Sequence, residues 1–357
     1  MNNTRYRYAI VGTGREHGTE GATGFGMAHP HIRAFQGTGR TELIAIAEPN
    51  ADNARHFLEK HEQPNATVYS GVHAMLAAET PDIASVCTWP HLHAEITVAL
   101  CEAGVRAVHC EKPMATTWGD AKRMKAAASA SGTILTFDHQ RRFLEPFQAT
   151  RKLLVDGAIG ELQRMEANCS DLCDWGTHWI DMLFFFNGET PAEWVLGQID
   201  SRNEKRIFGA FAEEQGLSHI KFANGVRATV TTGFEANTGQ AIRLYGSEGA
   251  IEIGWDSKIR LRGPGDADWR IVPTAESIHG GEAIPRAAAD LILALDQPNH
   301  KPLLTVDNAL RTTEVIFATW ESSRRRGRVD LPLQQEDSAL LAMLAAGQIG
   351  PGRAAIV

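Results

Sequence analysis

Short apolar runs alternate with amphipathic stretches through residues 8–137. The runs have the length of buried strands, and the stretches between them have helical spacing. Strand and helix in alternation predict a parallel sheet covered on both faces, which binds cofactors at the carboxyl ends of its strands. The predicted strands are 8–11, 43–47, 67–69, 83–87, 107–110 and 134–137, and the predicted helices are 31–35, 51–59, 73–78, 93–102 and 118–131.

The pattern changes after residue 140. Longer runs now alternate apolar and polar positions with a period of two, which indicates an antiparallel sheet with one covered face. We therefore predict an α/β domain over 1–140, an α+β domain over 141–335 and a tail over 336–357. The predicted strands beyond 140 are 193–199, 206–212, 217–222, 226–233, 241–246 and 250–253, and the predicted helices are 147–155, 174–186, 286–294, 306–323 and 338–346.

The composition is that of an ordinary globular protein. The chain has 357 residues, of which 43% are hydrophobic and 22% charged, and 35 basic against 43 acidic side chains give a formal net charge of −8. We expect no nucleic-acid partner, because such binding needs a basic footprint. No run of about 18 apolar residues predicts a membrane helix. We expect no secretory leader, since an apolar strand begins at Tyr8.

The five cysteines favour a reducing compartment. They are odd in number and form no CxxC pair, which is more typical of a cytoplasmic protein than of a secreted disulfide framework. Cys169, Cys173 and His178 are a conceivable zinc group, but structural zinc usually takes four ligands and no fourth is evident. We therefore predict a cytoplasmic protein without a metal site.

A glycine-containing turn follows the first predicted strand. Gly12-Thr13-Gly14 can bring backbone amides close to a pyrophosphate. Glu48 follows the second strand, where a carboxylate can accept hydrogen bonds from a ribose diol and would repel a 2′-phosphate. These residues predict NAD binding in preference to NADP. A plain tight turn and an ordinary solvated carboxylate are the alternative interpretations.

Two further segments carry side chains suited to proton transfer. Pro113 restricts Lys112 to an extended conformation, which would aim the ammonium out of the carboxyl edge of the sheet. Asp174 and His178 share one helix face if the helix begins at Asp174. A histidine beside a carboxylate is a candidate proton acceptor near neutral pH, and Asp181 could orient it. A surface lysine and a structural histidine are the alternatives.

In this order and at this spacing, these segments resemble the family of glucose-fructose oxidoreductase, inositol dehydrogenase and rhizopine-catabolism (MocA) proteins. The resemblance runs from about Tyr6 to Leu333. It rests on the GxG turn, Glu111-Lys112-Pro113, the D-x-x-x-H-x-x-D pattern from Asp174 to Asp181 and the turn at 244–249, with the segments at 47–50, 89–95, 140–143 and 156–160.

The resemblance implies a fold and an activity. The fold is an α/β Rossmann domain plus an α+β domain with an open, mostly antiparallel sheet, through which members form homodimers or homotetramers. The activity is hydride transfer between NAD(P) and a carbinol or carbonyl carbon of a sugar, polyol or related ring.

The resemblance also implies roles for particular residues. Lys112 would contact the reacting hydroxyl, His178 would be the general acid/base, and Asp174 would bind or orient the substrate. Trp175 and Arg142 are candidates for the substrate cleft, whereas Trp179 is predicted to pack in the core. Cofactor contacts are expected from Gly12, Thr13, Gly14, Glu48, Thr88, Pro90, His93, Glu111 and Lys112.

The chain departs from the family pattern at two places. Residues 17–25 are inserted after the GxG turn, and either a lid or an inert surface loop fits them. The tail beyond Leu333 could pack on the first domain or on a neighbouring subunit. Two other activities also stay open. One is an NAD-dependent glycosidase that keeps Lys112 and His178 without net cofactor turnover, and the other is a non-catalytic, cofactor-sensing regulator.

Overall fold

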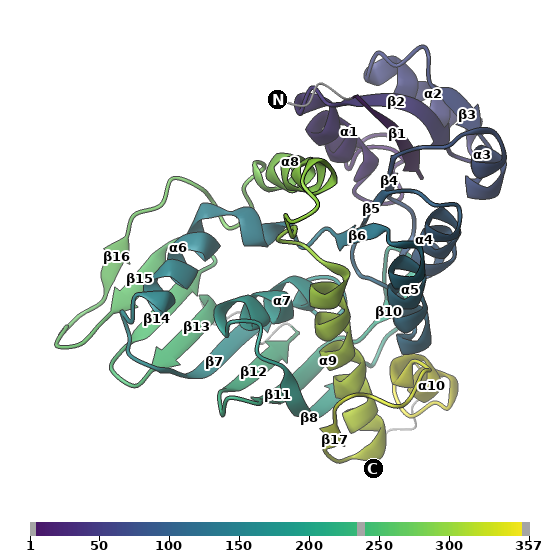
Figure 1. Cartoon of the computed structure of the whole chain (residues 1–357). Helices are drawn as coiled ribbons and strands as arrows, with labels where there is room; N and C mark the ends of the chain where they lie inside the picture. Colours follow the sequence, from purple (N-terminus) through teal and green to yellow (C-terminus); the bar gives the residue numbers. More distant parts are fainter. Residues whose placement is uncertain (1–4, 234–239, 352–357) are drawn as a thin grey trace. The chain divides into compact units, whose positions relative to one another are not determined.

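The computed structural model describes residues 5–233 and 240–351 and divides them into two compact units. The first unit holds residues up to 116, 120–140 and 281–310, and the second holds 117–119, 141–280 and 311 onward. Each unit is built around its own sheet (Figure 1).

The first unit contains the predicted parallel sheet. Its six strands lie in the order β3-β2-β1-β4-β5-β6, and every neighbouring pair is parallel. The strands are β1 (Tyr6–Val11), β2 (Thr41–Ala47), β3 (Thr67–Tyr69), β4 (Ile83–Val86), β5 (Ala107–Cys110) and β6 (Ile134–Phe137); the helices are α1 (Ala28–Gly37), α2 (Ala51–Lys60), α3 (Val72–Ala78), α4 (His93–Glu102), α5 (Trp118–Ser131) and α8 (Ala283–Asp296).

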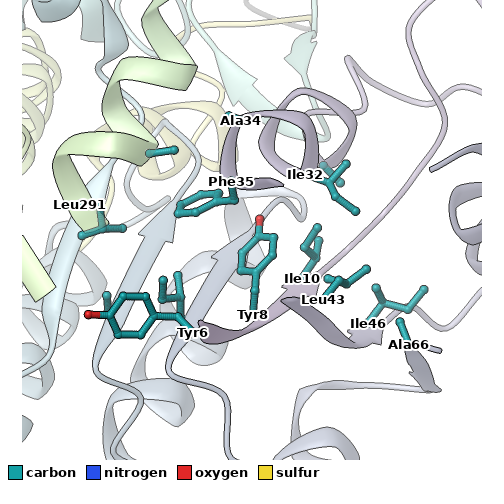
Figure 2. Close-up of a cluster of buried hydrophobic side chains, with 14 of the residues drawn as sticks. Tyr6, Tyr8, Ile10, Ile32, Ala34, Phe35, Leu43, Ile46, Ala66 and Leu291 are labelled. Atoms are coloured by element: carbon teal, nitrogen blue, oxygen red, sulfur yellow. The ribbon is translucent and has the colours of Figure 1, made fainter. Parts of the chain in front are cut away.

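Helix α8 joins the first unit, whereas the predicted boundaries placed its residues in the second domain. Its apolar side chains, Leu291 among them, extend the core formed by Tyr8 and Phe35 (Figure 2). An ion pair of 2.8 Å between Arg40 and Asp296 fastens the end of the helix. The spacing of apolar residues along α8 shows that one face is buried, but it cannot say against which sheet.

The second unit contains a nine-stranded mixed sheet in the order β16-β15-β14-β13-β7-β12-β11-β8-β17. Only β7 and β12 are parallel neighbours, so the predicted antiparallel character is confirmed for the rest. The strands are β7 (Leu162–Cys169), β8 (Ala192–Asp200), β11 (Gln215–Phe222), β12 (Arg227–Thr232), β13 (Gln240–Gly246), β14 (Ala250–Gly254), β15 (Ile259–Arg262), β16 (Arg270–Val272) and β17 (Val329–Asp330).

Three helices and a short hairpin also belong to the second half of the chain. The helices are α6 (Glu145–Val155), α7 (Gly176–Phe186) and α9 (Val306–Arg325), and α7 lies along the sheet beside β7 and β12 (Figure 1). The strand predicted over 206–212 is instead a hairpin of β9 (Lys205–Ile207) and β10 (Ala210–Ala212). Phe208 and Gly209 both take positive φ, at 49° and 74°, and so turn the chain back.

The predicted tail helix is present as α10 (Ala339–Ala345). Ser338 caps it, since its hydroxyl accepts from Leu341 N at 3.4 Å. The tail stays within the second unit: Gly119 N donates to Glu336 O at 2.8 Å, and Gly350 N donates to Ser201 O at 2.7 Å. In the part of the chain that the structure describes, no helix is long and apolar enough to cross a membrane.

Glu213 is a fully buried carboxyl group between β10 and β11. It accepts hydrogen bonds from Leu172 N and, at 3.1 Å, from Trp320 Nε1. Burial, helped by the nearby negative charge of Asp171, raises the pKa of Glu213 to about 7. The folded chain therefore holds this proton at a pH where the unfolded chain has released it.

We expect the free energy of unfolding to fall as pH rises from about 4.5 to about 7, by roughly 2–3 kcal/mol from this group alone. Glu213→Gln cannot ionise and is expected to flatten that dependence, which urea unfolding at several pH values measures. Glu102→Gln, at an exposed position of α4, serves as the matched control. An unchanged slope in Glu213→Gln would show that other groups set the pH dependence.

Candidate active site

Three chain segments meet at the carboxyl edge of the first unit's sheet. β1 pairs with β4, and β4 with β5, all in parallel. The segments that follow these strands therefore lie side by side: the Gly12-Thr13-Gly14 turn, residues 88–90 and Glu111-Lys112-Pro113. The strand order reverses between β1 and β4, and open α/β sheets bind ligands at such a point.

The glycine turn is shaped for close approach. Gly12 has φ of +81°, and a Cβ added there would lie 2.7 Å from Thr88 Cγ2. Glu48, only 7% exposed, fastens the turn. Its Oε2 accepts from Thr13 N at 2.8 Å, from Thr13 Oγ1 at 3.0 Å and from Gly14 N at 3.3 Å, while Oε1 accepts from Asn50 N at 2.9 Å. Since a carboxylate has about four acceptor positions in two oxygens, Oε1 keeps capacity for a ribose hydroxyl.

The segment after β4 offers a hydroxyl and a buried histidine. Among the described residues, Thr88 Oγ1 has no hydrogen-bond partner although it is buried, which suits a contact with a cofactor. Pro90 is buried at the start of a 3₁₀ turn. His93 is fully enclosed, with Nδ1 2.9 Å from Pro113 O and Nε2 3.1 Å from Thr88 O. The predicted cofactor contact of His93 is therefore replaced by a positioning role, because its ring holds two edge segments together.

The side chains of Glu111 and Lys112, which follow β5, have different surroundings. Lys112 is half-buried and precedes a cis peptide bond to Pro113. Glu111 is 5% exposed and turns inward, where its Oε1 lies 3.0 Å from His31 Nε2. Burial raises the pKa of Glu111. The carboxylate of Glu111 thus belongs to the interior, which corrects the cofactor contact expected of it, whereas Lys112 remains the candidate at the edge.

The inserted loop is fastened at its base. Glu16 forms ion pairs with Arg33 of α1, at 3.0 Å, and with Lys60 of α2. The Lys60 ammonium holds the pKa of Glu16 at about 2, so the carboxylate stays charged at ordinary pH. His17 and Phe25 pack with ring centroids 4.9 Å apart and draw the two ends of the insertion together. These contacts define a closed surface loop; its role as a lid stays a prediction.

Asp174, Trp175 and His178 lie in the second unit. Helix α7 begins at Gly176, two residues after the predicted start, because Asp174 N donates to Asp171 Oδ1 at 2.6 Å and Gly176 N donates to Asp171 O at 2.8 Å. A Cβ on Gly176 would lie 2.7 Å from Asp171 O, so this turn requires glycine. Asp174 therefore precedes the helix instead of sharing a face with His178, and both side chains are buried.

An aromatic cluster surrounds Trp175. Its ring centroid lies 5.6 Å from that of Trp255 and 5.5 Å from that of His279. The Arg141 guanidinium lies over Trp179, at 4.3 Å, and over Trp175, at 5.1 Å. Burial lowers the pKa of Arg141 to about 10, and its Nη1 has no hydrogen-bond partner among the described residues. Aromatic faces and a guanidinium donor together suit a ligand with apolar faces and polar edges.

No motif points to Trp255 and His279, which lie about 80 and 100 residues beyond Trp175 along the chain and come near it through the fold of the second unit. Trp179 is fully buried, as predicted, and its Nε1 donates to Asn168 O at 2.9 Å.

Arg142 has a different environment from the predicted substrate cleft. Its side chain is 1% exposed, and Nε and Nη2 each donate to Asp181 at 2.7 Å. Nη1 donates to Glu189 Oε1 at 2.5 Å, and Arg311 pairs with the same carboxylate at 2.7 Å. The guanidinium of Arg142 is thus committed to the buried carboxylate of Asp181 and to the partly exposed carboxylate of Glu189, which favours a structural role over the predicted substrate contact. Asp181 is correspondingly the partner of Arg142.

Comparison with known families and proteins gives the following matches. Residues 6–139 match the oxidoreductase family with NAD-binding Rossmann fold designated GFO/IDH/MocA, and residues 170–252 match a C-terminal domain of the same family. The chain is 31% identical over 179 residues to D-glucoside 3-dehydrogenase of Escherichia coli, a match spanning 49% of this chain and 47% of that one. It is 23% identical to D-apiose dehydrogenase of Paraburkholderia graminis, over 97% of this chain and 95% of that one.

Solved structures match the fold over nearly the whole chain. Levoglucosan dehydrogenase, solved in complex with NADH and levoglucosan, superimposes with a TM-score of 0.77 over 92% of this chain and 100% of that one. The sequences are 20% identical. At that identity the likeness concerns the fold alone.

Proposed function

Because this chain belongs to the GFO/IDH/MocA family of NAD(P)-dependent oxidoreductases, we propose that it transfers hydride between the nicotinamide and a carbinol carbon of a sugar or polyol. The observation that carries the proposal is the place of Lys112 at the carboxyl edge of the Rossmann sheet. It follows the strand beside the one that Thr88 follows, and Thr88 Oγ1 has no hydrogen-bond partner among the described residues. Two relatives are named for dehydrogenation of sugars, which supports this substrate class.

The residue roles follow from what the reaction needs. When bound, the nicotinamide accepts or supplies the hydride. Hydride leaves the carbinol carbon only as the hydroxyl proton is removed, and we assign that proton to His178 as general base. The Lys112 ammonium stabilises negative charge that develops on the same oxygen. Asp174 orients the substrate hydroxyls, and Trp175 packs against the sugar ring.

We propose NAD as the preferred cofactor, because the Glu48 carboxylate beside the glycine turn would repel a 2′-phosphate. Glu48→Ala is expected to lower the dissociation constant for NADPH relative to that for NADH by about tenfold, equivalent to about 1.4 kcal/mol. Fluorescence titration of the reduced cofactors measures the ratio. Glu42→Ala, at an exposed position of β2, the strand that Glu48 follows, is the control. Equal ratios in the Glu48 variant and the wild type would remove Glu48 from cofactor selection.

We also propose that the open face of the second sheet pairs two copies of the chain. Leu196 of β8 and Leu217 of β11 point outward, with 47% and 46% of their surfaces exposed. Their strands are neighbours, and His219 beside Leu196 packs on Trp194 with ring centroids 5.7 Å apart. An outward apolar cluster on a broad sheet is the kind of surface that a partner covers.

The double variant Leu196→Glu, Leu217→Glu is expected to be a folded monomer, because four charges would otherwise meet in a two-fold interface. Light scattering after gel filtration measures the mass. Val155→Glu, at a position 79% exposed on α6, should leave the assembly unchanged. A wild-type chain that is monomeric at micromolar concentration would contradict this assignment.

The activity is tested in two steps. Thermal unfolding is followed with NAD, NADH, NADP and NADPH, and sugars, inositols and sugar lactones are then assayed with the preferred cofactor by absorbance of reduced nicotinamide. A shift with NAD(H) and turnover of a sugar or polyol are expected. Release of an aglycone without net reduced nicotinamide would favour the glycosidase instead. Cofactor binding without either reaction would favour a regulator, and no shift would contradict the proposal.

The five free thiols are consistent with the predicted cytoplasmic location, which also remains a proposal.

A further inference from the structure

Three buried side chains of the first unit bring atoms that could bind a metal ion close together. They are His31 of α1, His109 of β5 and Asp138, one residue beyond β6. One ligand atom of each lies within 4.8 Å of the other two. All three side chains are at most 2% exposed. The reaction assigned above uses none of them.

The separations between these atoms are too long for strong hydrogen bonds but suit ligands of one ion. Asp138 Oδ2 lies 3.8 Å from His31 Nε2, and Asp138 Oδ1 lies 3.5 Å from His109 Nε2. In a tetrahedral zinc site with bonds of about 2.0–2.2 Å, neighbouring ligand atoms lie about 3.3–3.6 Å apart. The 3.5 Å separation from His109 lies in that range and the 3.8 Å separation from His31 lies just above it, each measured to a different oxygen of Asp138.

Among the described residues, hydrogen bonding leaves these atoms available except His31 Nε2, which lies 3.0 Å from Glu111 Oε1. Neither oxygen of Asp138 nor Nε2 of His109 has a hydrogen-bond partner among the described residues. The Asp138 oxygens face the two imidazoles at 3.5 and 3.8 Å, and a buried carboxylate without shorter hydrogen bonds is costly, since ionised groups are strongly stabilised by water. A cation between the carboxylate and the two rings would offset the cost of burying this charge.

The far side of each ring is held by a hydroxyl. His109 Nδ1 lies 2.8 Å from Thr136 Oγ1, and His31 Nδ1 lies 3.1 Å from Ser85 Oγ. Ser85 is in turn 2.7 Å from the Tyr8 hydroxyl. Metal-binding histidines characteristically donate their second N–H to such a partner, which fixes the tautomer and points the bare Nε2 at the ion.

A carboxylate beside His31 is the candidate fourth ligand, outside the three-residue cluster. Glu111 Oε1 lies 3.0 Å from His31 Nε2 and is also buried. Two neutral imidazoles and two carboxylates carry a charge of −2, which one divalent cation neutralises. The set is all nitrogen and oxygen, and the enclosure leaves no open position, so it resembles a structural site more than a catalytic one.

We propose that His31, His109, Asp138 and Glu111 form a buried structural site for a divalent transition-metal ion of the Zn²⁺ class. The ion joins α1 to the ends of β5 and β6, and through Glu111 it anchors the segment that carries Lys112. Protons are the competing occupants: a doubly protonated His31 can donate to Glu111, and the cluster is then a network of ion pairs.

The test is metal analysis of the intact protein, expressed in zinc-supplemented medium and purified without a metal-affinity tag. Mass spectrometry of the acid-digested chain is expected to find roughly one zinc ion per chain. Refolding with Co²⁺ is expected to give the intense visible absorption of tetrahedral cobalt. His109→Leu and Asp138→Asn each remove one ligand and should lower the zinc content by about tenfold or more. His73→Ala, at an exposed histidine of α3, should keep it.

A further variant tests the orientation of the His109 ring without removing a metal ligand. Thr136→Val keeps every proposed ligand but removes the hydroxyl behind His109, and it should weaken zinc binding by about 10- to 100-fold in a chelator competition. Wild-type chains with neither zinc nor the cobalt spectrum would show that protons fill the cluster and would overturn the proposal. Full zinc content in both His109→Leu and Asp138→Asn would do the same, since the ion would then lie elsewhere.

Discussion

Replacing His178 by alanine is expected to lower kcat/KM by about 10²- to 10⁴-fold, because the hydroxyl proton of the substrate would lose its acceptor. The imidazole lies near the start of α7 with 4% of its surface exposed. Steady-state kinetics over a range of pH measures the effect. The wild type should show an ionisation that the variant lacks, and the dissociation constant for NADH should stay within about threefold, an energy difference of about 0.7 kcal/mol.

A purely structural histidine would behave differently, since its removal would lower the unfolding midpoint and leave the shape of the pH profile unchanged. Lys112→Ala provides the companion measurement, with an expected loss of about 10²- to 10³-fold in kcat. Lys112→Arg should recover little of it, because a planar guanidinium does not replace a compact ammonium. The matched control is His73→Ala, on the exposed surface of α3. Activity of His178→Ala within a few-fold of wild type would refute the assignment.

Replacing Arg142 by methionine is expected to cost about 3–5 kcal/mol of the free energy of unfolding, because a buried carboxylate would lose its partner. Asp181 is fully buried and accepts two hydrogen bonds from this guanidinium, each 2.7 Å long. Glu189 lies at its other edge and also accepts from Arg311, at 2.7 Å. Urea unfolding followed by fluorescence and circular dichroism measures the difference.

The companion variants identify the cause of that loss. Arg142→Met combined with Asp181→Leu removes both partners and should recover part of the stability, since no buried charge is then left unpaired. Arg123→Met breaks an ion pair whose arginine is 64% exposed and should change stability by no more than about 1 kcal/mol. A loss from Arg142→Met as small as that from Arg123→Met would show that Asp181 finds other compensation.

The elements of the first unit could be predicted because each has a clear local pattern. The four strands and three helices predicted from 67–69 to 134–137 match the structure within about one residue. In the second unit β7 went unpredicted, although it is central to the sheet. Buried Met165 and Ala167 alternate there with polar Arg164, Glu166 and Asn168, so the period-two signal of this strand is present in the sequence although the strand was not predicted.

The candidate site was predicted in part. The order GxG, Glu111-Lys112-Pro113 and the histidine of α7 follows from motifs that are local in the chain. The inward turn of Glu111, the enclosure of His93 and the pairing of Arg142 with Asp181 do not, because each depends on a partner supplied by another element. A motif gives a residue type and a backbone position, while the direction of the side chain is set by packing.

The sequence by itself therefore determined the family, the two kinds of sheet and the residues suited to hydride and proton transfer, because periodicity and short motifs are properties of neighbouring residues. Only the tertiary structure decided that Glu48 fastens the glycine turn and that α8 packs on α1. It alone brought His31, His109 and Asp138 together. Those three residues span 107 positions of the chain, and they meet because adjacent parallel strands place distant residues in one register beneath a helix.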